Sequence, residues 1–213
     1  CGYNDFDDIL LNDINTPMKD NGEPYSTFSS YHSKALGIEV NEPDNYSNKL
    51  KFKKANNLKH QIKMKDLDNF YDHNEHINVN GGRKLALEIL KGIKNQKKYN
   101  KLRGLCDYKS THLSAYIKFG CVSMREVYHT FRSELGSSND LVKQLYWRDF
   151  YYNIAYSFPH VFGNAFKEKY DKIKWKYNQK YWEAWINGTT GFPLQDAGMR
   201  ELYQTGFMHN RCR

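Results

Sequence analysis

The chain has 213 residues and a formal net charge of +8, from 32 Lys and Arg residues against 24 Asp and Glu residues. No stretch approaches the roughly 18 uninterrupted apolar residues of a membrane-spanning helix, so we expect no membrane partner. The positive charge predicts a polyanionic partner, because each phosphate neutralised by Lys or Arg releases counterions. Aromatic residues make up 15% of the sequence, which favours a core packed with rings and side chains that stack on flat ligands.

The cysteines give no sign of two common uses of this residue. Cys1, Cys106, Cys121 and Cys212 show no C-x-x-C spacing, so neither a zinc site nor a disulfide framework is indicated, and we expect no metal. The sequence shows no secretory signal pattern, and we therefore expect a reducing, intracellular location in the cytoplasm or nucleus. Because the first residue is Cys rather than Met, we also expect a fragment that has lost sequence upstream.

The N-terminal part of the chain predicts little regular structure. Residues 1–48 are punctuated by Pro and Gly, so we expect an irregular, poorly packed segment with at most two or three short strands, such as Ile9–Leu11 or Tyr25–Phe28. Residues 49–80 form a basic linker in this interpretation. The lysine-rich stretch from Lys49 to Lys65 fits either a solvated linker or surface helix, or an arm that contacts DNA.

From residue 81 onward, apolar residues recur with helical spacing, which predicts a mainly α domain over residues 81–213. Leu85, Ile89 and Ile93 mark an amphipathic helix over about 83–95. Ser123 and Glu126 form a capping box, in which each side chain bonds an orphan amide of a helix that ends at a left-handed glycine. Further caps and breakers predict helices over about 123–135, 139–157, 179–186 and 193–206.

A cluster of hydroxyl residues predicts a phosphate site. Ser110, Thr111 and Ser114 stand at the start of a helix, where backbone amides and hydroxyls point at an anion and the helix N-terminus favours negative charge. This signal is weak by itself, because Ser and Thr cap most helices without binding a ligand.

A second cluster lies on the helix predicted over about 139–157. Gln144, Trp147 and Arg148 share one side at three- and four-residue spacing. That side could receive a flipped-out base, with the indole stacking, the amide bonding a base edge and the guanidinium meeting a phosphate. The alternative is that Trp147 and Phe150 pack in the core and Arg148 forms an ion pair.

The run from Trp182 to Leu202, followed by Gly206 to Arg213, resembles the flavin-site signature of the photolyase/cryptochrome family. The two preceding clusters stand in the order and approximate spacing of the same family, and residues 8–28 look like the end of its N-terminal α/β antenna domain. The resemblance implies a remnant of that domain and a linker over 1–48, a basic linker over 49–80, and a truncated helical FAD-binding domain over 81–213, as in class-I-like photolyases.

The resemblance also implies roles for individual residues. FAD would be held by Tyr99, Ser110, Thr111, His112, Leu113, Ser114 and Arg213. DNA would be contacted by Arg103, Gln144, Trp147, Arg148, Asn210 and Arg211, and catalysis would depend on Gln144, Trp147 and Asn210. Trp175 matches the exposed end of the family's electron-transfer tryptophan chain; the alternative is a packing residue.

The implied function is light-driven electron transfer from FAD to a pyrimidine dimer in DNA. A cyclobutane dimer is favoured over a (6-4) lesion because His209 is followed by Asn210, although Gln144 stands where Glu is common in repair enzymes for cyclobutane dimers. The alternatives are a cryptochrome-like blue-light sensor, an inactive remnant, or half of a split photolyase that keeps residual DNA binding. We expect FAD to be weakly held or absent in the isolated chain, and a separate polypeptide could supply the rest of the domain.

Overall fold

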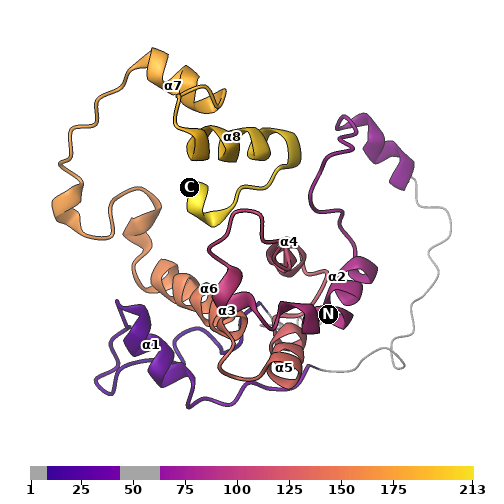
Figure 1. Ribbon diagram of the computed structural model, residues 1–213. Helices are drawn as coiled ribbons and strands as arrows, with labels where there is room; N and C mark the ends of the chain where they lie inside the picture. The colour runs from indigo at the N-terminus through magenta and orange to yellow at the C-terminus, as the bar shows by residue number, and fades with distance from the viewer. Residues whose placement is uncertain (1–8, 44–62) are drawn as a thin grey trace. The chain divides into compact units, whose positions relative to one another are not determined.

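The computed structural model describes residues 9–43 and 63–213 (Figure 1). Contacts divide the chain into two compact units. The first unit joins the residues up to Pro43 with Gly81–Tyr177, and the second joins the described residues up to Asn80 with Asn178–Arg213. The described residues contain no strand, only an isolated bridge between Met18 and Pro24, which confirms the mainly α fold. No described helix is long and apolar enough to cross a membrane.

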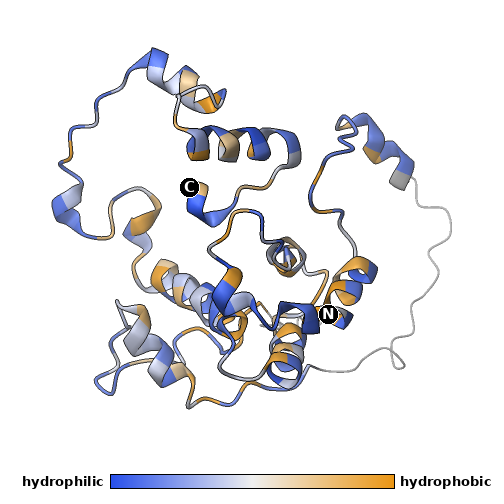
Figure 2. Ribbon diagram, in the orientation of Figure 1, coloured by the Kyte–Doolittle hydropathy of each residue, from blue (hydrophilic) through white to orange (hydrophobic). Residues whose placement is uncertain are grey.

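The first unit is built around its longest helix, α6. Helices α1, α3 and α5 all contact α6, and α2 contacts α4. Hydrophobic and hydrophilic residues are mixed along these helices (Figure 2), and α1, α2, α4, α5 and α6 each bury two or more side chains. The helices are α1 (Phe28–Ala35), α2 (Arg83–Lys91), α3 (Tyr99–Leu102), α4 (Leu113–Lys118), α5 (Met124–Leu135) and α6 (Asp140–Ser157), with short 3₁₀ turns η2 (Ile93–Gln96), η3 (Pro159–Phe162) and η4 (Glu168–Tyr170).

The N-terminal segment is better ordered than its sequence predicts. Residues 28–35 form helix α1, and neither Ile9–Leu11 nor Tyr25–Phe28 is a strand. Phe28, Tyr31 and Ala35 are spaced by three and four residues, so one face of this short helix is apolar and is buried. The expectation of poor packing is therefore wrong for the described residues 9–43, because that face packs on α6.

A buried polar anchor holds the irregular residues before α1 on helix α6. One carboxylate oxygen of Asp149 accepts hydrogen bonds from the backbone amides of Leu11 and Asn12, at 2.9 and 3.3 Å. The amide oxygen of Asn153, one turn later, accepts from the backbone of Asn15 at 3.2 Å, and its nitrogen donates to the Tyr31 hydroxyl at 3.3 Å. Burial, with the nearby charge of Asp149, raises the pKa of Tyr31 above its ordinary value.

The helices after residue 81 largely follow their sequence signals. Asn139 caps α6 by accepting from the Leu141 amide at 3.0 Å, as expected. The helix predicted over about 83–95 is divided, because α2 ends at Lys91 and Gly92 leads into η2. The buried positions there are Ala86, Leu90 and Ile93, whereas Leu85 is exposed and Ile89 is half-buried.

The second unit is smaller and buries fewer side chains. It contains η1 (Met64–Asn69), α7 (Gln179–Ile186), α8 (Pro193–Thr205) and η5 (Asn210–Cys212), and both predicted helices are confirmed. Residues 74–80 run beside the end of α8, where the Asn78 amide donates to the Thr205 carbonyl at 3.0 Å. Its buried apolar cluster consists of Met199, Met208 and Cys212.

Two expectations about the N-terminal half stay predictions. Most of the lysine-rich stretch from Lys49 to Lys65, predicted as a linker or a DNA-contacting arm, lies outside the described residues. The boundaries predicted at residues 48 and 80 separate a domain remnant, a linker and a truncated domain of a longer protein. Contacts within this chain do not test that division.

Candidate functional site

The hydroxyl-rich turn Ser110–Ser114 leads into helix α4. The Thr111 hydroxyl accepts a hydrogen bond from the Leu113 amide at 3.3 Å, and the buried Leu113 side chain fixes the start of the helix. Ser110 and Thr111 are half-buried and Ser114 is exposed, so their hydroxyls lie within reach of a ligand. Hydroxyl donors at the start of a helix suit the oxygens of a diphosphate, and this donor set therefore fits that part of FAD.

The turn depends on an uncommon backbone conformation at His112. This residue has φ of +53° and ψ of +18°, in the left-handed region that few non-glycine residues adopt. The left-handed residue stands immediately before α4, between the two hydroxyls that precede the helix and the one within its first turn. The sequence gives no signal for this conformation, because His has only a modest preference for it.

Two further predicted residues come from helix α3 of the same unit. Burial raises the pKa of Tyr99, although the nearby Arg103 opposes the shift. Arg103 follows the end of α3 and forms an ion pair with Asp140 at 3.3 Å, so part of its charge is already used within the chain. Gln96 donates to the Lys109 carbonyl at 3.3 Å and thereby ties η2 to the segment that enters the hydroxyl-rich turn.

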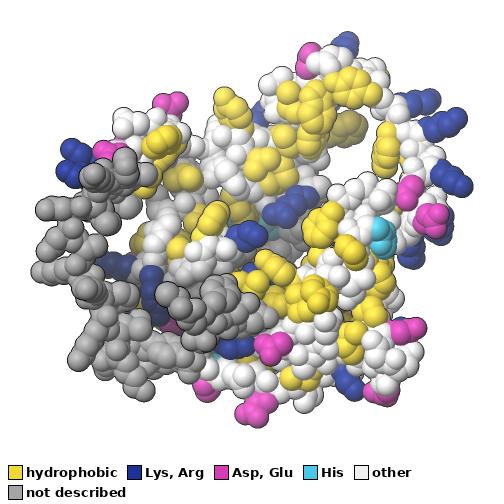
Figure 3. Space-filling model, turned by 180° about the vertical axis from the view of Figure 1, so that it is seen from behind, with side chains coloured by type: hydrophobic (Ala, Val, Ile, Leu, Met, Phe, Trp, Pro, Cys, Tyr) yellow, Lys and Arg dark blue, Asp and Glu magenta, His cyan; other side chains and the backbone are white. Residues whose placement is uncertain are grey.

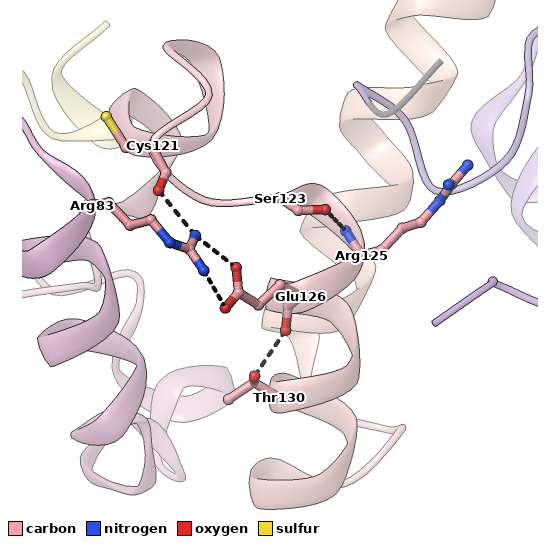
Figure 4. Close-up of polar contacts among 6 residues, drawn as sticks. All are labelled: Arg83, Cys121, Ser123, Arg125, Glu126 and Thr130. Carbon is pink, nitrogen blue, oxygen red and sulfur yellow. Dashed lines mark hydrogen bonds and ion pairs between the residues drawn. The ribbon is translucent and has the colours of Figure 1, made fainter. Parts of the chain in front are cut away.

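A polar clamp around Arg83 holds the elements on either side of α4 (Figure 4). The Arg83 guanidinium forms two 3.0 Å hydrogen bonds with the two carboxylate oxygens of Glu126, and a third with the Cys121 carbonyl at 3.3 Å. The Ser123 hydroxyl accepts from the Arg125 amide at 3.2 Å, so Ser123 caps α5 as predicted, but this bond goes to the second helical amide and not to the third, which the predicted capping box requires. Both oxygens of Glu126 are engaged by Arg83, a partner that lies too far away in sequence to be predicted.

Helix α6 carries Gln144, Trp147 and Arg148 on one side, as predicted. Gln144 is exposed. The Trp147 ring stacks on Phe28 with a centroid distance of 3.6 Å and an interplanar angle of 7°, so Phe28 occupies one face of the indole. The Arg148 guanidinium donates to the Ile9 carbonyl and lies 4.6 Å from the centre of the Tyr152 ring.

These contacts agree with the packing alternative for Trp147 and give Arg148 an intramolecular partner. The partner is a backbone carbonyl and an aromatic ring rather than the carboxylate that the alternative named. Contacts of Trp147 and Arg148 with a flipped base or a phosphate stay predictions, as does the hydrogen bond of Gln144 to a base edge.

In the second unit, Asp196 organises the turn between α7 and α8. Its carboxylate accepts from the Thr190 hydroxyl and amide, at 2.6 and 2.8 Å, and from the Gly191 amide at 2.9 Å. These hydrogen bonds, led by the one from the Thr190 side chain, hold the pKa of Asp196 below its ordinary value. Arg200 closes the turn by donating twice to the Gly188 carbonyl, at 2.7 and 3.1 Å.

Two glycines of the same run let backbones approach closely. Gly188 has φ of +59°, and a Cβ atom there would stand 2.8 Å from the Asp196 carbonyl oxygen. A Cβ atom on Gly198 would stand 2.4 Å from the Cβ atom of Cys212. Much of the specific sequence from Gly188 to Arg200 therefore has a structural role, which sequence reasoning missed because it assigned the motif to the flavin.

The C-terminal turn η5 presents the last predicted residues. Cys212 is buried against α8, while Asn210, Arg211 and Arg213 are exposed. The His209 ring nitrogen accepts from the Arg211 amide at 3.1 Å, so His209 caps this turn. Exposure leaves Asn210 and Arg211 accessible to a ligand. Trp175, in the first unit, is 86% exposed.

Comparisons with known proteins show which proteins this chain resembles. Residues 141–213 match the family described as the FAD binding domain of DNA photolyase. The chain is 37% identical over 127 residues to a deoxyribodipyrimidine photo-lyase of Alkalihalophilus pseudofirmus, covering 58% of this chain and 26% of the relative. It is 38% identical over 111 residues to a (6-4)DNA photolyase of Oryza sativa subsp. japonica, covering 49% of this chain and 20% of the relative.

Solved structures extend the likeness over most of the chain. A bacterial class III photolyase from Agrobacterium tumefaciens superposes with a TM-score of 0.72 at 26% identity, over 96% of this chain and 45% of the other. A cryptochrome from Synechocystis sp. PCC6803 gives a TM-score of 0.64 at 26% identity, over 88% of this chain and 42% of the other. Over residues 141–213 the chain matches a photolyase family in sequence, and over most of its length it has the fold of photolyases and cryptochromes. It spans less than half the length of these relatives.

Proposed function

We propose that this chain belongs to a photolyase-like flavoprotein that binds FAD and repairs pyrimidine dimers in DNA. The observation that carries this proposal is the family match over residues 141–213, which contains Gln144, Asn210, Arg211 and Arg213. The accessible hydroxyls of the Ser110–Ser114 turn, which lie outside that match, supply an independent feature suited to a diphosphate.

Different residues of the chain would bind different parts of the cofactor. Ser110, Thr111 and Ser114 donate to the diphosphate, His112 and Leu113 set the shape of the turn, and Tyr99 adds a protonated hydroxyl nearby. Arg213 contributes a positive charge against the flavin ring. When bound in its reduced form, FAD supplies under blue light the electron that splits the dimer.

The DNA contacts would depend on the exposed end of the second unit and on the arginines of the first. Arg211 is exposed and suits a phosphate, and Asn210 beside it suits the lesion. Arg103 and Arg148 already have intramolecular partners, so they contribute less free charge than Arg211. The His209 and Asn210 pair favours a cyclobutane dimer over a (6-4) lesion.

A titration with flavin derivatives tests the cofactor proposal. FAD, FMN and riboflavin are added to the purified chain, and quenching of flavin fluorescence measures binding. We expect FAD to bind at least about tenfold more tightly than riboflavin, since only FAD carries the diphosphate that the hydroxyl-rich turn holds. Thr111→Ala should remove most of that preference, whereas equal binding of FAD and riboflavin would contradict the cradle.

Fluorescence anisotropy with labelled DNA tests the second half of the proposal. Binding of a duplex should weaken steeply with salt, because it rests on phosphate contacts. Arg211→Ala should weaken damaged and undamaged duplex alike, since a phosphate contact carries no information about the lesion. Blue-light loss of dimers from an oligonucleotide would support repair; flavin photoreduction without loss of dimers would support a cryptochrome-like sensor instead.

A further inference from the structure

The last part of the first unit combines lysines with exposed aromatic rings. We call residues 166–177 the Lys-aromatic segment. Its acidic residues are Glu168 and Asp171. Its lysines are Lys167, Lys169, Lys172, Lys174 and Lys176, and all are exposed. After η4 the chain continues without helix or strand up to Asn178, and Figure 1 shows this part as an open trace.

In the second half of the segment, residues 172–177, each lysine is followed by an aliphatic or aromatic residue. Lys172, Lys174 and Lys176 are followed by Ile173, Trp175 and Tyr177, respectively. Trp175 is 86% exposed and Tyr177 is 74% exposed, so much of each ring faces solvent. Figure 3 shows several dark blue Lys or Arg side chains projecting on one side of this view, with a few magenta acidic side chains near them. In an extended chain successive side chains turn to opposite sides, which separates a row of rings from a row of charges.

We propose that the Lys-aromatic segment binds an unpaired nucleic-acid strand. Bases stack on Trp175 and Tyr177, and the flexible lysine stems reach the phosphates on either side of a stacked base. This inference deepens the proposed function by adding a contact for single-stranded DNA, on residues apart from those predicted to meet the lesion. A duplex suits the segment less well, because paired bases keep their faces stacked on one another.

The chemistry of the segment favours nucleic acid over an anionic membrane. Peripheral membrane binders bury one broad apolar face of an amphipathic helix. Residues 172–177 form no helix, and their apolar side consists of one aliphatic residue and two rings. Phosphates spaced along a strand match lysines spaced along an extended chain better than a continuous lipid surface does.

Binding of a labelled 15-nucleotide oligodeoxyadenylate, which cannot contain a pyrimidine dimer, tests the proposal by fluorescence anisotropy over a range of salt. Trp175→Ala should weaken binding about tenfold, as expected for the loss of one stacked base, and should leave the salt dependence unchanged. Replacing Lys172, Lys174 and Lys176 together with Gln should reduce the slope of log K against log salt by about 2, because each lost phosphate contact on a single strand removes about 0.7.

A matched triple variant controls for general charge. Lys91, Lys97 and Lys98 are equally exposed lysines elsewhere in the first unit, and replacing them with Gln removes the same charge. The proposal holds if this control binds the oligodeoxyadenylate like the unmodified chain. It is overturned if both triple variants lose affinity equally, if Trp175→Ala changes nothing, or if phosphatidylserine vesicles bind the chain and the oligonucleotide does not.

The result can be separated from the fate of the repair proposal. Arg211→Ala is expected to weaken duplex binding and to leave oligodeoxyadenylate binding intact. Equal binding of FAD and riboflavin, together with intact oligodeoxyadenylate binding, would count against the cofactor part of the proposed function alone. A preference for FAD over riboflavin without oligodeoxyadenylate binding would refute the role of the Lys-aromatic segment alone.

Discussion

The two units of this chain are stabilised in different ways. The first buries a set of large side chains around α6, including Tyr31, Tyr146 and Phe131, and secures its N-terminal segment with the buried Asp149. Among the residues of the second unit that the structure describes, few apolar side chains are buried, and helix α7 buries none. Its order comes from the hydrogen bonds of Asp196 and from glycines that let α8 and η5 approach closely. The flavin-site signature that begins at Trp182 therefore lies in the unit with the smaller core. There, hydrogen bonds and close contacts at glycines stabilise the structure more than apolar packing does.

Removal of the Asp149 carboxylate should have the largest effect on stability, and the loss should fall on the first unit. In Asp149→Ala the buried amides of Leu11 and Asn12 lose their acceptor, and we expect the first unit to lose about 3 kcal/mol of stability or more. Asp149→Asn keeps one acceptor oxygen and should lose less. Hydrogen exchange measured by mass spectrometry should show faster exchange over residues 9–43 in the alanine variant. Unchanged exchange there would mean that apolar burial alone holds the segment.

Gly198→Ala should disturb the second unit by a somewhat smaller amount. The added methyl group would stand 2.4 Å from the Cys212 Cβ atom, so η5 must move away from α8. Alanine favours a helix over glycine by about 1 kcal/mol, but overpacking of about 1–3 kcal/mol should outweigh that gain. We expect faster hydrogen exchange over residues 206–213 and weaker duplex binding through Arg211.

Gly81→Ala is the matched control, because a methyl group there meets nothing within 4 Å. It should leave exchange over residues 206–213 unchanged. If the two alanine variants behave alike, close approach at Gly198 is not what places η5.

The sequence predicted the parts of this fold that depend on local signals. Asn139 and Pro193 mark the starts of α6 and α8, and both helices begin where the caps predict. Helix α1 was missed because only eight residues carry its pattern, between irregular segments. The partners of Asp149 and Glu126 lie far away in the chain, and no local pattern predicts such pairs. The hydroxyl-rich turn could be located from sequence, but the left-handed His112 that shapes it could not.

Acidification should weaken the second unit through Asp196. The pKa of this carboxyl is lowered in the folded chain from an ordinary value of 3.8, so its ionised form is the one that folding favours. Its stabilising contribution is therefore complete well above pH 4, begins to shrink as pH falls toward 4, and is lost as pH falls through the lowered pKa. Hydrogen exchange over residues 188–200, compared between pH 6 and pH 3, should show the loss. Asp196→Asn should reduce the difference between the two pH values, and an unchanged difference would assign it to another group.

The Arg83 clamp should contribute least to stability, although Arg83 bonds both carboxylate oxygens of Glu126 (Figure 4). The Arg83 side chain is 57% exposed, so water competes for both hydrogen bonds with Glu126 and salt screens the charges. A double-mutant cycle with Arg83→Ala and Glu126→Ala should give a coupling free energy of about 0.5 kcal/mol, smaller in 1 M salt. Arg83→Lys keeps the charge but loses the fork that bonds both oxygens at once, and should cost most of that coupling. A coupling free energy above about 2 kcal/mol would be as strong as that of a buried ion pair. It would also mean that the first unit, like the second, depends on hydrogen bonds between polar side chains.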